Sequence, residues 1–546
     1  MGATMTDSPP DPNEPTDQPA EDARLDRPDD YHPAGGYPVD TTCADAPGRS
    51  DDETVRLAGR VVLWRNMGGR AFGQIQDQTG RVQVSLEKKA LGAEVYTPWA
   101  KGVKLGDFIG VTGQMWTTNS GERTVAVSDL TILTKAFRSM PDKWAGVSDT
   151  ELRYRRRYLD LLVNDESRER FLTRTRVVSA LRRFLDDNRF LEIETPILQA
   201  AASGAAARPF STHHNALDRD YFLRISPETY LKRVVAGSLD RVYEIGRNFR
   251  NEGVDSSHLQ EFTMLEWYAA YWDYQDNIRF TQAMIQAAID AVHADQRITF
   301  QGVELDFGGE WPVIDYRDAV REHTGIDLNV IHDLDELRAA IKGADIEGVA
   351  RGAGSGEGND VSDVPSYAAL VDLLYKRTVR PTLVQPCFLV HHPAELVPLA
   401  RRSDEDGSRL DMFQVVVHGW EIAKGYSELV DPFEQRARLE EQAELRAAGD
   451  DETMMMEDDF IEAMEYGMPP MSGVGIGIDR LVALLTDAPT LRDVVLFPQM
   501  QDKPSAGGSI QALDASEVAE AGDDGAADAE PMADPPPPGE PAPGEV

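Results

Sequence analysis

The sequence predicts an α+β protein in which a small N-terminal β-barrel precedes a larger region of mixed helices and strands. Five short strand-like segments, separated by Gly, Asn and Asp turns, follow one another between residues 53 and 135. The apolar positions of residues 151–188 repeat with helical periodicity, and residues 241–268 contain two alternating segments typical of an antiparallel hairpin. With 546 residues, the chain is long enough for two or three folded units.

The two ends of the chain differ in composition from its middle. Residues 1–52 hold 13 acids and 3 bases, and residues 501–546 hold 11 acids and 1 base. Both ends are rich in Pro and Ala and poor in large apolar side chains, so we expect them to be disordered. Between them we expect a barrel domain at 53–140 and a second domain at 141–500.

The net charge of −39 bears on the choice of partner. Affinity for nucleic acid rests largely on neutralising phosphates, so an acidic chain that binds RNA must use local patches of arginine. Only 11 of the 55 basic residues are Lys. An acidic, lysine-poor surface suits a high-salt cytoplasm, where self-repulsion is screened, and an ordinary acidic enzyme is the alternative.

The chain contains two cysteines, Cys43 and Cys387, far apart in sequence. Neither a disulfide framework nor a cysteine-based metal site is indicated, which fits a reducing cytosol. The sequence has no run of about 18 apolar residues and no recognisable signal peptide. These observations predict a cytoplasmic protein that does not act in a membrane.

The strand-like segments of the barrel are VRLAGRVVLW, AFGQIQD, RVQVSLE, DFIGVTGQMW and RTVAVSDLTIL. Five short strands at this spacing are typical of a small barrel such as an OB-fold.

Residues 151–188 are expected to form a helix with one apolar face, made by Phe171, Val177, Val178, Leu181, Phe184 and Leu185. The segment FLEIETP that follows is typical of a strand ended by Pro196. A further helix is expected at roughly 274–294, and the glycine-rich run at 351–360 is expected to be a flexible loop.

The hairpin predicted at 241–268 carries more charge than a core hairpin should. Its strands present Arg250, Glu252, Glu261 and Glu266, and a long polar loop joins them. Charged side chains at period two on a half-buried sheet indicate a polar ligand that lies across it.

The segment GVGIGIDRLVALL contains closely spaced glycines, as a dinucleotide-binding turn does. Here, however, the order is glycine-rich strand, then Asp479 and Arg480, then an apolar helix. No acidic residue ends a second strand at the spacing that a Rossmann unit needs, which argues against dinucleotide binding.

In their order and spacing, the helix with FLEIETP, the hairpin with FRNE and the segment GIGIDRLVALL resemble the three signature motifs of class II aminoacyl-tRNA synthetases. The strings SGAAARPFSTHHNALDRDYFLRISPETYLKR, RVYEIGRNFRNEG and GYSELVDP are similar to those of class II lysyl-tRNA synthetases. The resemblance implies an OB-fold that binds the anticodon and a catalytic domain with an antiparallel sheet flanked by helices. It also implies ATP-dependent activation of L-lysine to lysyl-adenylate and transfer of the lysyl group to tRNA(Lys).

The resemblance assigns ATP to the hairpin and to the glycine-rich segment. Arg250 would hold the α-phosphate and the lysine carboxylate, and Arg480 would bind the γ-phosphate and stack on the adenine, whose other face would meet Phe262. Glu252 and His258 belong to the same ATP site. The bidentate fork and fixed charge of Arg suit the catalytic roles of Arg250 and Arg480. The alternative is that these two arginines form structural salt bridges with Glu252 and Asp479.

A lysine side chain loses hydration on entering a pocket, so carboxylates must replace the lost water. The positions that match lysine-binding residues of the family are Gly204, Glu228, Glu266, Tyr268 and Glu428. The resemblance implies that Glu428 and Tyr268 face the side-chain ammonium group, while Glu228 and the backbone near Gly204 face the α-amino group.

In the barrel, Arg65, Phe72, Gln83 and Glu122 match the family positions that bind the U-rich lysine anticodon. An aromatic ring stacks on an unpaired base, while Gln, Glu and Arg bind base edges. The alternative for Phe72 is an aromatic residue of the barrel core.

The sequence departs from the family pattern at four places. Glu421 matches a metal-binding position, but the other metal position holds Gln414 in place of Glu. Lys424 stands where the family has Asn, Leu259-Gln260 stand in place of Asn-Pro, and Ser203 in place of Gly.

The changes at 414 and 424 together add about two positive charges, the charge of one Mg²⁺ ion. We hypothesise that Lys424 partly replaces a metal ion beside the phosphates, and the number of Mg²⁺ ions is left open. The alternative is a tRNA-binding paralogue with weakened or lost activation.

The resemblance also implies a homodimer whose interface contains the helix and strand of the first motif. Aspartyl- and asparaginyl-tRNA synthetases share the architecture, but their pockets need a cation for the substrate side chain. The glutamates at 228 and 428 argue against that assignment.

Overall fold

The computed structural model describes residues 33–51, 53–138, 140, 149–253, 258–344, 346, 361, 364, 366–447 and 453–500. The expected disorder at 1–32 and 501–546 and the flexible loop expected at 351–360 lie outside the described residues. Within the described part, no helix combines the length and the apolar character needed to cross a membrane.

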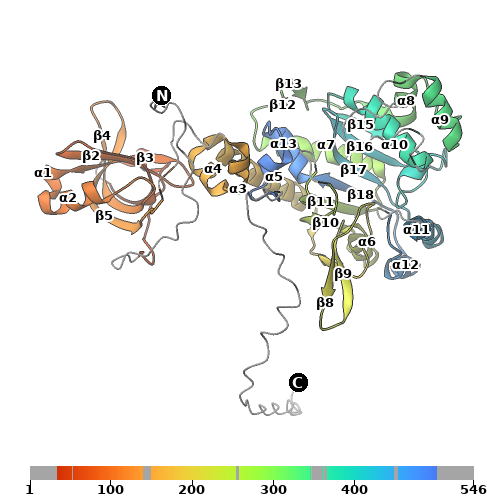
Figure 1. Cartoon of the computed structure of the whole chain (residues 1–546), viewed down its shortest axis with the longest axis horizontal. Coiled ribbons are helices and arrows are strands. Elements are labelled where there is room, and N and C mark those ends of the chain that lie inside the picture. Colours follow the sequence, from red (N-terminus) through yellow and green to blue (C-terminus); the bar gives the residue numbers. More distant parts are fainter. Residues whose placement is uncertain are drawn as a thin grey trace, which may run out of the picture. The chain divides into compact units, whose positions relative to one another are not determined.

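The N-terminal strands close into a barrel in the order β1-β2-β3-β5-β4 (Figure 1). Neighbouring strands are antiparallel except β3 and β5, which are parallel. Strand β1 pairs with both β2 and β4, and its register shifts between Val61 and Leu63, which bends the strand and helps the barrel to close. The strands are Thr54–Asn66 (β1), Arg70–Gln76 (β2), Arg81–Glu87 (β3), Phe108–Thr117 (β4) and Arg123–Thr134 (β5), with helices Lys88–Leu91 (α1) and Ala93–Gly102 (α2) between β3 and β4.

A segment that precedes the barrel packs onto it. Cys43 and Ala46 are fully buried in the barrel core, and the backbone N–H of Cys43 donates to the Asp77 carboxylate over 2.9 Å. The disorder expected for residues 1–52 therefore extends too far, because part of 33–51 belongs to the barrel. Two small buried side chains give no periodic signal in a segment rich in Pro, Gly and Asp, so the sequence did not indicate this contact.

An eight-stranded sheet in the order β14-β15-β16-β17-β18-β11-β10-β6 forms the centre of the second region. Its pairs are antiparallel except at the two edges, where β14 pairs with β15 and β10 pairs with β6 in parallel. The last strand in sequence, β18, lies between β17 and β11 and joins the two halves of the sheet. The strands are Leu191–Glu192 (β6), Arg241–Phe249 (β10), Glu261–Ala270 (β11), Val313–Asp315 (β14), Cys387–Val390 (β15), Met412–Val417 (β16), Trp420–Ser427 (β17) and Met471–Gly477 (β18).

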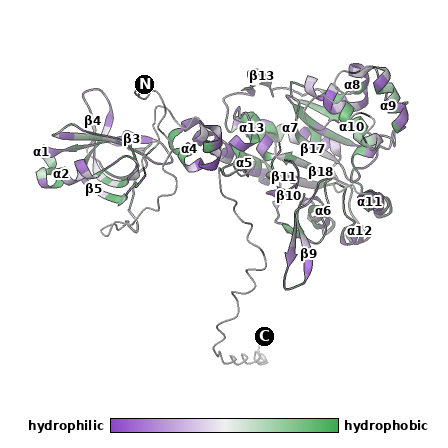
Figure 2. Ribbon diagram, viewed as in Figure 1, coloured by the Kyte–Doolittle hydropathy of each residue, from purple (hydrophilic) through white to green (hydrophobic). Residues whose placement is uncertain are grey.

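Helices cover both faces of this sheet (Figure 1). Trp267 of β11 is buried in the core that contains α5, α7 and α13, whereas its neighbour Tyr268 packs with α6 on the opposite face. Strand alternation thus separates a dry face from the face that carries polar groups. Figure 2 shows α13 largely in hydrophobic colours, as a helix buried against the sheet requires. The helices are Asp165–Asp187 (α5), Glu228–Ala236 (α6), Tyr274–Asp290 (α7) and Ile478–Leu485 (α13).

The helix expected at 151–188 is divided into three. Arg156 and Asn164 leave helical geometry between Thr150–Arg155 (α3), Arg157–Val163 (α4) and α5. The buried carboxylate of Asp160 accepts hydrogen bonds from Arg153, Arg157, Asn164 and Ser167. These polar contacts hold the bends, and apolar periodicity alone does not reveal them.

Smaller elements complete the second region. A three-stranded sheet has the order β7-β9-β8, and a two-stranded one pairs β12 with β13. They are Leu198–Gln199 (β7), Ser211–His214 (β8), Arg219–Leu223 (β9), Arg297–Phe300 (β12), Val303–Asp306 (β13), Tyr316–Thr324 (α8), Leu334–Gly343 (α9), Tyr367–Thr378 (α10), Pro432–Ala447 (α11) and Asp458–Glu465 (α12).

Candidate active site

A cavity of about 310 Å³ opens beside the large sheet, on the side of α6. Its wall gathers residues that lie more than 270 positions apart in sequence. Most of the sequence-predicted lysine and ATP residues line it, namely Gly204, Glu228, Arg250, Glu252, His258, Phe262, Glu266, Tyr268 and Arg480, and the predicted metal ligand Glu421 and Lys424 join them. Glu428 and Gln414 do not line it.

The glycines of β18 make room for the cavity. Gly473 lies between Tyr268 of β11 and Tyr426 of β17, and Gly475 lies between Glu266 and Lys424. A Cβ atom on Gly473 would overlap the ring of Tyr268 and lie 2.6 Å from Glu428 Oε1. The glycine-rich strand therefore forms a floor on which the side chains of its two neighbours converge.

One end of the cavity is anionic. Glu228 stands at the start of α6, and Glu266 projects from β11; both are buried. The Ser226 hydroxyl donates to Glu266 over 2.8 Å, and the Tyr268 hydroxyl donates to its other oxygen over 3.1 Å. Burial and the nearby charge of Glu228 raise the pKa of Glu266 to about 8. The Tyr426 hydroxyl donates to Glu228 over 2.6 Å. This end is suited to an ammonium group.

Glu428 lies behind this end, not in its wall. Its carboxylate is buried and forms an ion pair with Lys232, whose ammonium nitrogen also lies 2.6 Å from Glu228 Oε1. Sequence reasoning missed both Lys232 and Tyr426. The four-residue spacing of Glu228 and Lys232 on one helix was a usable signal, because residues at i and i+4 share a helix face.

The other end of the cavity is cationic. The guanidinium of Arg250 lies over the ring of Phe262, 5.1 Å from its centroid. Burial lowers the pKa of Arg250, and the carboxylates of Glu252 and Glu266 oppose that shift. Arg480 donates to the backbone carbonyl of Glu421 over 3.0 Å, which fixes its guanidinium at the wall. Two arginines at one end, with Lys424 in the same cavity wall, suit a polyphosphate.

The salt bridge considered between Arg480 and Asp479 is not the arrangement found. Asp479 pairs with Arg174 of α5 at 2.6 Å and accepts the backbone N–H of Thr263 over 2.8 Å. Asp479 therefore ties the start of α13 to α5 and β11, and Arg480 projects from that anchored turn toward the cavity.

The two positions matched to metal binding do not form a pair of carboxylates. The amide of Gln414 donates to Glu421 Oε2 over 2.6 Å, and Gln414 stands opposite Lys424 in the register of β16 and β17. Among the described residues, no group of three or more His, Cys, Asp and Glu side chains is placed to hold a metal ion. One oxygen of Glu421 is thus engaged by an amide, and the cation Lys424 stands three residues further along the same strand, β17.

The other departures from the family pattern have structural partners. The Ser203 hydroxyl donates to the buried Glu457, which Arg233 also contacts. Leu259 packs against the core, and the Gln260 side chain donates to the Gly253 carbonyl over 2.9 Å. The Gln260 backbone carbonyl accepts the N–H of Arg250 over 2.8 Å, which fixes the turn that carries this arginine.

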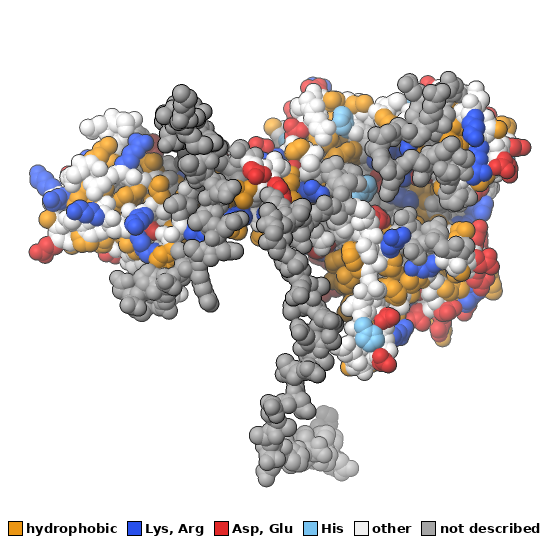
Figure 3. All heavy atoms as spheres, viewed as in Figure 1, with side chains coloured by type: hydrophobic (Ala, Val, Ile, Leu, Met, Phe, Trp, Pro, Cys, Tyr) orange, Lys and Arg blue, Asp and Glu red, His pale blue; other side chains and the backbone are white. Residues whose placement is uncertain are grey.

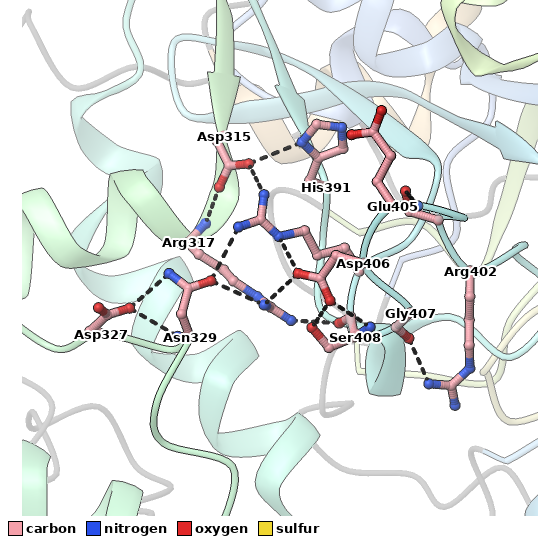
Figure 4. A network of polar contacts seen from close by, with 12 residues as sticks. Asp315, Arg317, Asp327, Asn329, His391, Arg402, Glu405, Asp406, Gly407 and Ser408 are labelled. Atoms are coloured by element: carbon pink, nitrogen blue, oxygen red, sulfur yellow. Dashed lines mark hydrogen bonds and ion pairs between the residues drawn. The ribbon is translucent and has the colours of Figure 1, made fainter.

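A polar network of residues that do not line the cavity lies around Asp315 and Arg317 (Figure 4). Asp315 pairs with His391 at 3.0 Å and with Arg409 at 3.1 Å, while Arg317 donates to Asn329 over 3.2 Å. The partners of Asp315 flank the segment 396–398, which lines the cavity. These contacts fasten residues on either side of that segment to β14 and α8.

The sequence-predicted anticodon residues lie on the barrel, apart from the cavity. Arg65 and Phe72 face each other across β1 and β2, and Gln83 on β3 donates to Thr124 over 2.8 Å. Phe72 is half-buried and is not part of the barrel core, so the core alternative is not supported. Arg65 and Glu122 are exposed. Figure 3 shows several basic side chains on the visible face of the barrel.

Comparison with known proteins places this geometry in a family. The family described as tRNA synthetases class II (D, K and N) matches residues 149–501, and the one described as an OB-fold nucleic acid binding domain matches residues 55–133. A lysine–tRNA ligase of Pelotomaculum thermopropionicum is 45% identical over 453 residues, 83% of this chain and 87% of that relative. A lysine–tRNA ligase of Enterococcus faecalis is 45% identical over 447 residues, which cover 82% of this chain and 87% of that relative. A lysine–tRNA ligase of Aquifex aeolicus is 43% identical over 448 residues, which cover 82% of this chain and 73% of that relative.

These matches confirm the predicted fold and the resemblance from which it was drawn. An OB-fold barrel precedes a class II synthetase domain, and relatives with the same name match more than four fifths of the chain. The chain therefore belongs to the class II tRNA synthetases and, among them, to the lysine–tRNA ligase family.

Proposed function

We propose that the protein is a lysine–tRNA ligase, which activates L-lysine with ATP and transfers the lysyl group to tRNA(Lys). The observation that carries this proposal is one cavity with an anionic end at Glu228 and Glu266 and a cationic end at Arg250 and Arg480, with Lys424 also in its wall. An amino acid with a cationic side chain fits the first end, and a polyphosphate fits the second.

In the first step, a carboxylate oxygen of lysine attacks the α-phosphorus of ATP, and pyrophosphate leaves. Both reactants are anions, so they meet only where fixed positive charge offsets their repulsion. Arg250, at the cationic end, interacts electrostatically with Glu266 of the anionic end and would contact the lysine carboxylate and the α-phosphate together. The contact between Arg250 and Phe262 holds the guanidinium in advance, which lowers the entropy lost on binding.

Arg480 would hold the far phosphates, with Glu252 and His258 completing the ATP site. Phe262 would give up part of its contact with Arg250 when the adenine stacks on it. In the second step, a hydroxyl of the terminal ribose of tRNA attacks the carbonyl carbon of the adenylate, and AMP leaves.

The choice of lysine over an acidic or amide side chain follows from the charges behind the pocket. Aspartate would need a cation without a carboxylate partner at the end of the pocket. The ammonium behind that end, on Lys232, is already paired with Glu228 and Glu428. The remaining carboxylate, Glu266, therefore favours a cationic substrate.

ATP reactions in this family typically use a divalent ion, and the residues present fit one such ion, not two. Mg²⁺ is usually held by one or two carboxylates together with substrate phosphates. Glu421 could supply one such ligand oxygen, and bound Mg²⁺ would neutralise phosphate charge. Gln414 and Lys424 do not suit a second ion, so we propose that Lys424 supplies that charge.

The alternative, a tRNA-binding paralogue with lost activation, rests on the same two residues. Lysine-dependent exchange of pyrophosphate into ATP distinguishes the active ligase from the paralogue. The wild type is compared with the double variant Gln414→Glu with Lys424→Asn. We expect the wild type to be active at lower Mg²⁺ than the double variant. Activity found only in the double variant would establish the paralogue.

We also propose that the protein is a cytoplasmic homodimer. The edge strand β6 and the residues after it expose Leu191, Ile197 and Leu198 to between 44% and 50% of their area. Large apolar side chains at a sheet edge are typical of a covered interface. Both cysteines are buried thiols, which fits a reducing compartment. Light scattering after size-exclusion chromatography should give twice the mass of one chain for the wild type. The double variant Leu191→Asp with Leu198→Asp should give the mass of a single chain.

A further inference from the structure

We propose that Lys232 is a positioning residue of the lysine pocket: its buried ammonium group holds one oxygen of Glu428 and leaves the other oxygen for the side-chain ammonium of the substrate. The inference rests on the proposed lysine specificity and adds a residue to it.

Lys232 is placed as an internal counter-ion. Its side chain is fully buried and does not line the cavity. The ammonium nitrogen lies 2.6 Å from Glu228 Oε1 and contacts Glu428 Oε2. The rings of Tyr426, Phe460 and Tyr268 surround it with centroids at 5.6, 5.9 and 6.0 Å. A lysine in this setting stays charged only because carboxylates replace its lost water.

Glu428 is held from one side only. Both of its carboxylate oxygens are buried and neither has a hydrogen-bond partner among the described residues, but Oε2 forms an ion pair with Lys232, whereas Oε1 has no such cation. That oxygen lies next to Gly473, which lines the cavity. A buried carboxylate oxygen without a donor is costly, so the arrangement is complete only when a donor arrives from the cavity side. The substrate ammonium is such a donor.

The charges balance when lysine binds. Glu228, Glu266 and Glu428 carry three potential negative charges, and Lys232 and Arg250 carry two positive ones. The site with all groups ionised is therefore −1, and zwitterionic lysine with its side-chain ammonium is +1. Without Lys232, Glu428 would lose the positive charge that opposes the rise of its pKa on burial, and it would take up a proton more readily.

The rival reading is that Lys232 occupies the substrate's own place and must be displaced. The structure favours positioning, because Lys232 lies behind Glu228 and outside the cavity wall, whereas Glu228 itself lines the cavity. The two readings predict opposite effects of removing the ammonium group. Positioning predicts weaker binding of lysine, and competition predicts tighter binding.

The variant Lys232→Met tests whether Lys232 positions Glu428 or competes with the substrate, and Lys376→Met is the matched control. Lys376 also pairs with a carboxylate four residues away, Asp372, but on the exposed surface of α10. In pyrophosphate exchange we expect Lys232→Met to raise KM for lysine by about tenfold or more, with kcat and KM for ATP within about threefold of wild type. Calorimetry should report the same loss of lysine affinity in the absence of ATP. Lys376→Met should match wild type.

The pH profile gives a readout that a merely structural role would not move. The groups that face Lys232 are Glu228, Glu428, Tyr268 and Tyr426, with Glu266 beyond them under the influence of Arg250. Loss of the ammonium should move the acid limb of kcat/KM for lysine to higher pH, by about one unit. An unchanged or lowered KM for lysine with the wild-type pH profile would overturn the proposal.

A crystal structure of wild type with bound lysine decides the matter even if Lys232→Met fails to fold. We expect Lys232 to remain on Glu428 while the substrate ammonium contacts the other oxygen; a displaced Lys232 would contradict positioning. Absence of lysine-dependent exchange in wild type would instead reject the proposed function. The two failures are therefore distinguishable.

Discussion

Glu266 belongs to the anionic end of the cavity and interacts with the charge of Arg250 at the other end. It accepts from Ser226 and Tyr268 and is influenced by the charges of Glu228 and Arg250. Because its pKa is about 8, Glu266 is protonated in a large fraction of the molecules at neutral pH. An ammonium ligand prefers the ionised carboxylate, so lysine binding should lower this pKa and release a proton.

A pH dependence follows from the sign of this shift. The pKa of Glu266 is raised from 4.5 to about 8, so its contribution to stability is fully present below 4.5 and is lost as pH rises through 8. Lysine binding has the opposite dependence, because it needs the ionised form. We expect kcat/KM for lysine to rise with pH up to about 8 and the melting temperature without lysine to fall over the same range.

Steady-state exchange kinetics and thermal melts between pH 6 and 9 check both trends. Glu266→Gln cannot ionise, so it should lose the pH-dependent rise and retain about a tenth or less of the wild-type kcat/KM. The profile of kcat/KM for ATP serves as the control. A wild-type rise that persists in Glu266→Gln would assign the titration to another group.

The sequence indicated most cavity residues because the family motifs mark positions. Arg250, Glu266 and Tyr268 line one cavity, and their roles stay predictions. The motifs gave no means of placing Glu428 behind the wall or of pairing it with Lys232. Such a contact depends on how α6 rests on the sheet, and side-chain burial is not visible from spacing along one helix.

Among the elements, β18 shows how backbone composition shapes the site. Gly473 and Gly475 alternate with Val474 and Ile476, which are buried in the core on the opposite face. The strand is therefore anchored on one side and bare on the other. Glycine generally weakens a strand because it has no side chain to pack. Here the missing side chain leaves space between Tyr268 and Tyr426.

Gly473→Ala should abolish tight lysine binding. A methyl group there would overlap the Tyr268 ring and press on Glu428, whereas at Gly475 the nearest atom, 2.9 Å away, is the end of the flexible Met264 side chain. We expect KM for lysine to rise by about 100-fold in Gly473→Ala and by far less in Gly475→Ala. Equal effects of the two substitutions would show that strand propensity, not crowding, is responsible.

Elements with a strong period were predictable. The hairpin expected at 241–268 is present as β10 and β11, and the helix expected at roughly 274–294 is α7. The single helix expected at 151–188 is wrong, because polar contacts around Asp160 divide it. The strand expected in FLEIETP is reduced to Leu191–Glu192, since only these residues pair with β10.

At the scale of the whole molecule, the barrel and the large sheet carry separate parts of the proposed reaction. Amino-acid activation needs only the cavity, whereas recognition of the anticodon would use the outer face of β1, β2 and β3. Phe72 lies on that face, with Arg70 at 6.0 Å from its ring. The sequence predicted this division because strand spacing in the barrel and motif order in the remainder are independent signals.

Phe72→Ala should therefore impair charging of tRNA and leave activation unchanged. Stacking of a base on an aromatic ring contributes about 1–3 kcal/mol, so we expect KM for tRNA(Lys) to rise by roughly 10-fold to 100-fold. Aminoacylation with tRNA transcripts measures this effect, and lysine-dependent pyrophosphate exchange is the control. Reduced exchange would indicate damage to the fold rather than loss of an RNA contact.

The position of β18 determines when the large sheet can be completed during synthesis of the chain. Residues 471–477 leave the ribosome after the other seven strands of the sheet, yet they occupy its middle. Until then β11 and β17 each have an unpaired edge, the kind of surface on which nascent chains aggregate. A ribosome stalled before residue 471 would thus hold two half-sheets without a pocket, and arrival of the final strand would build the sheet and the lysine site in one event.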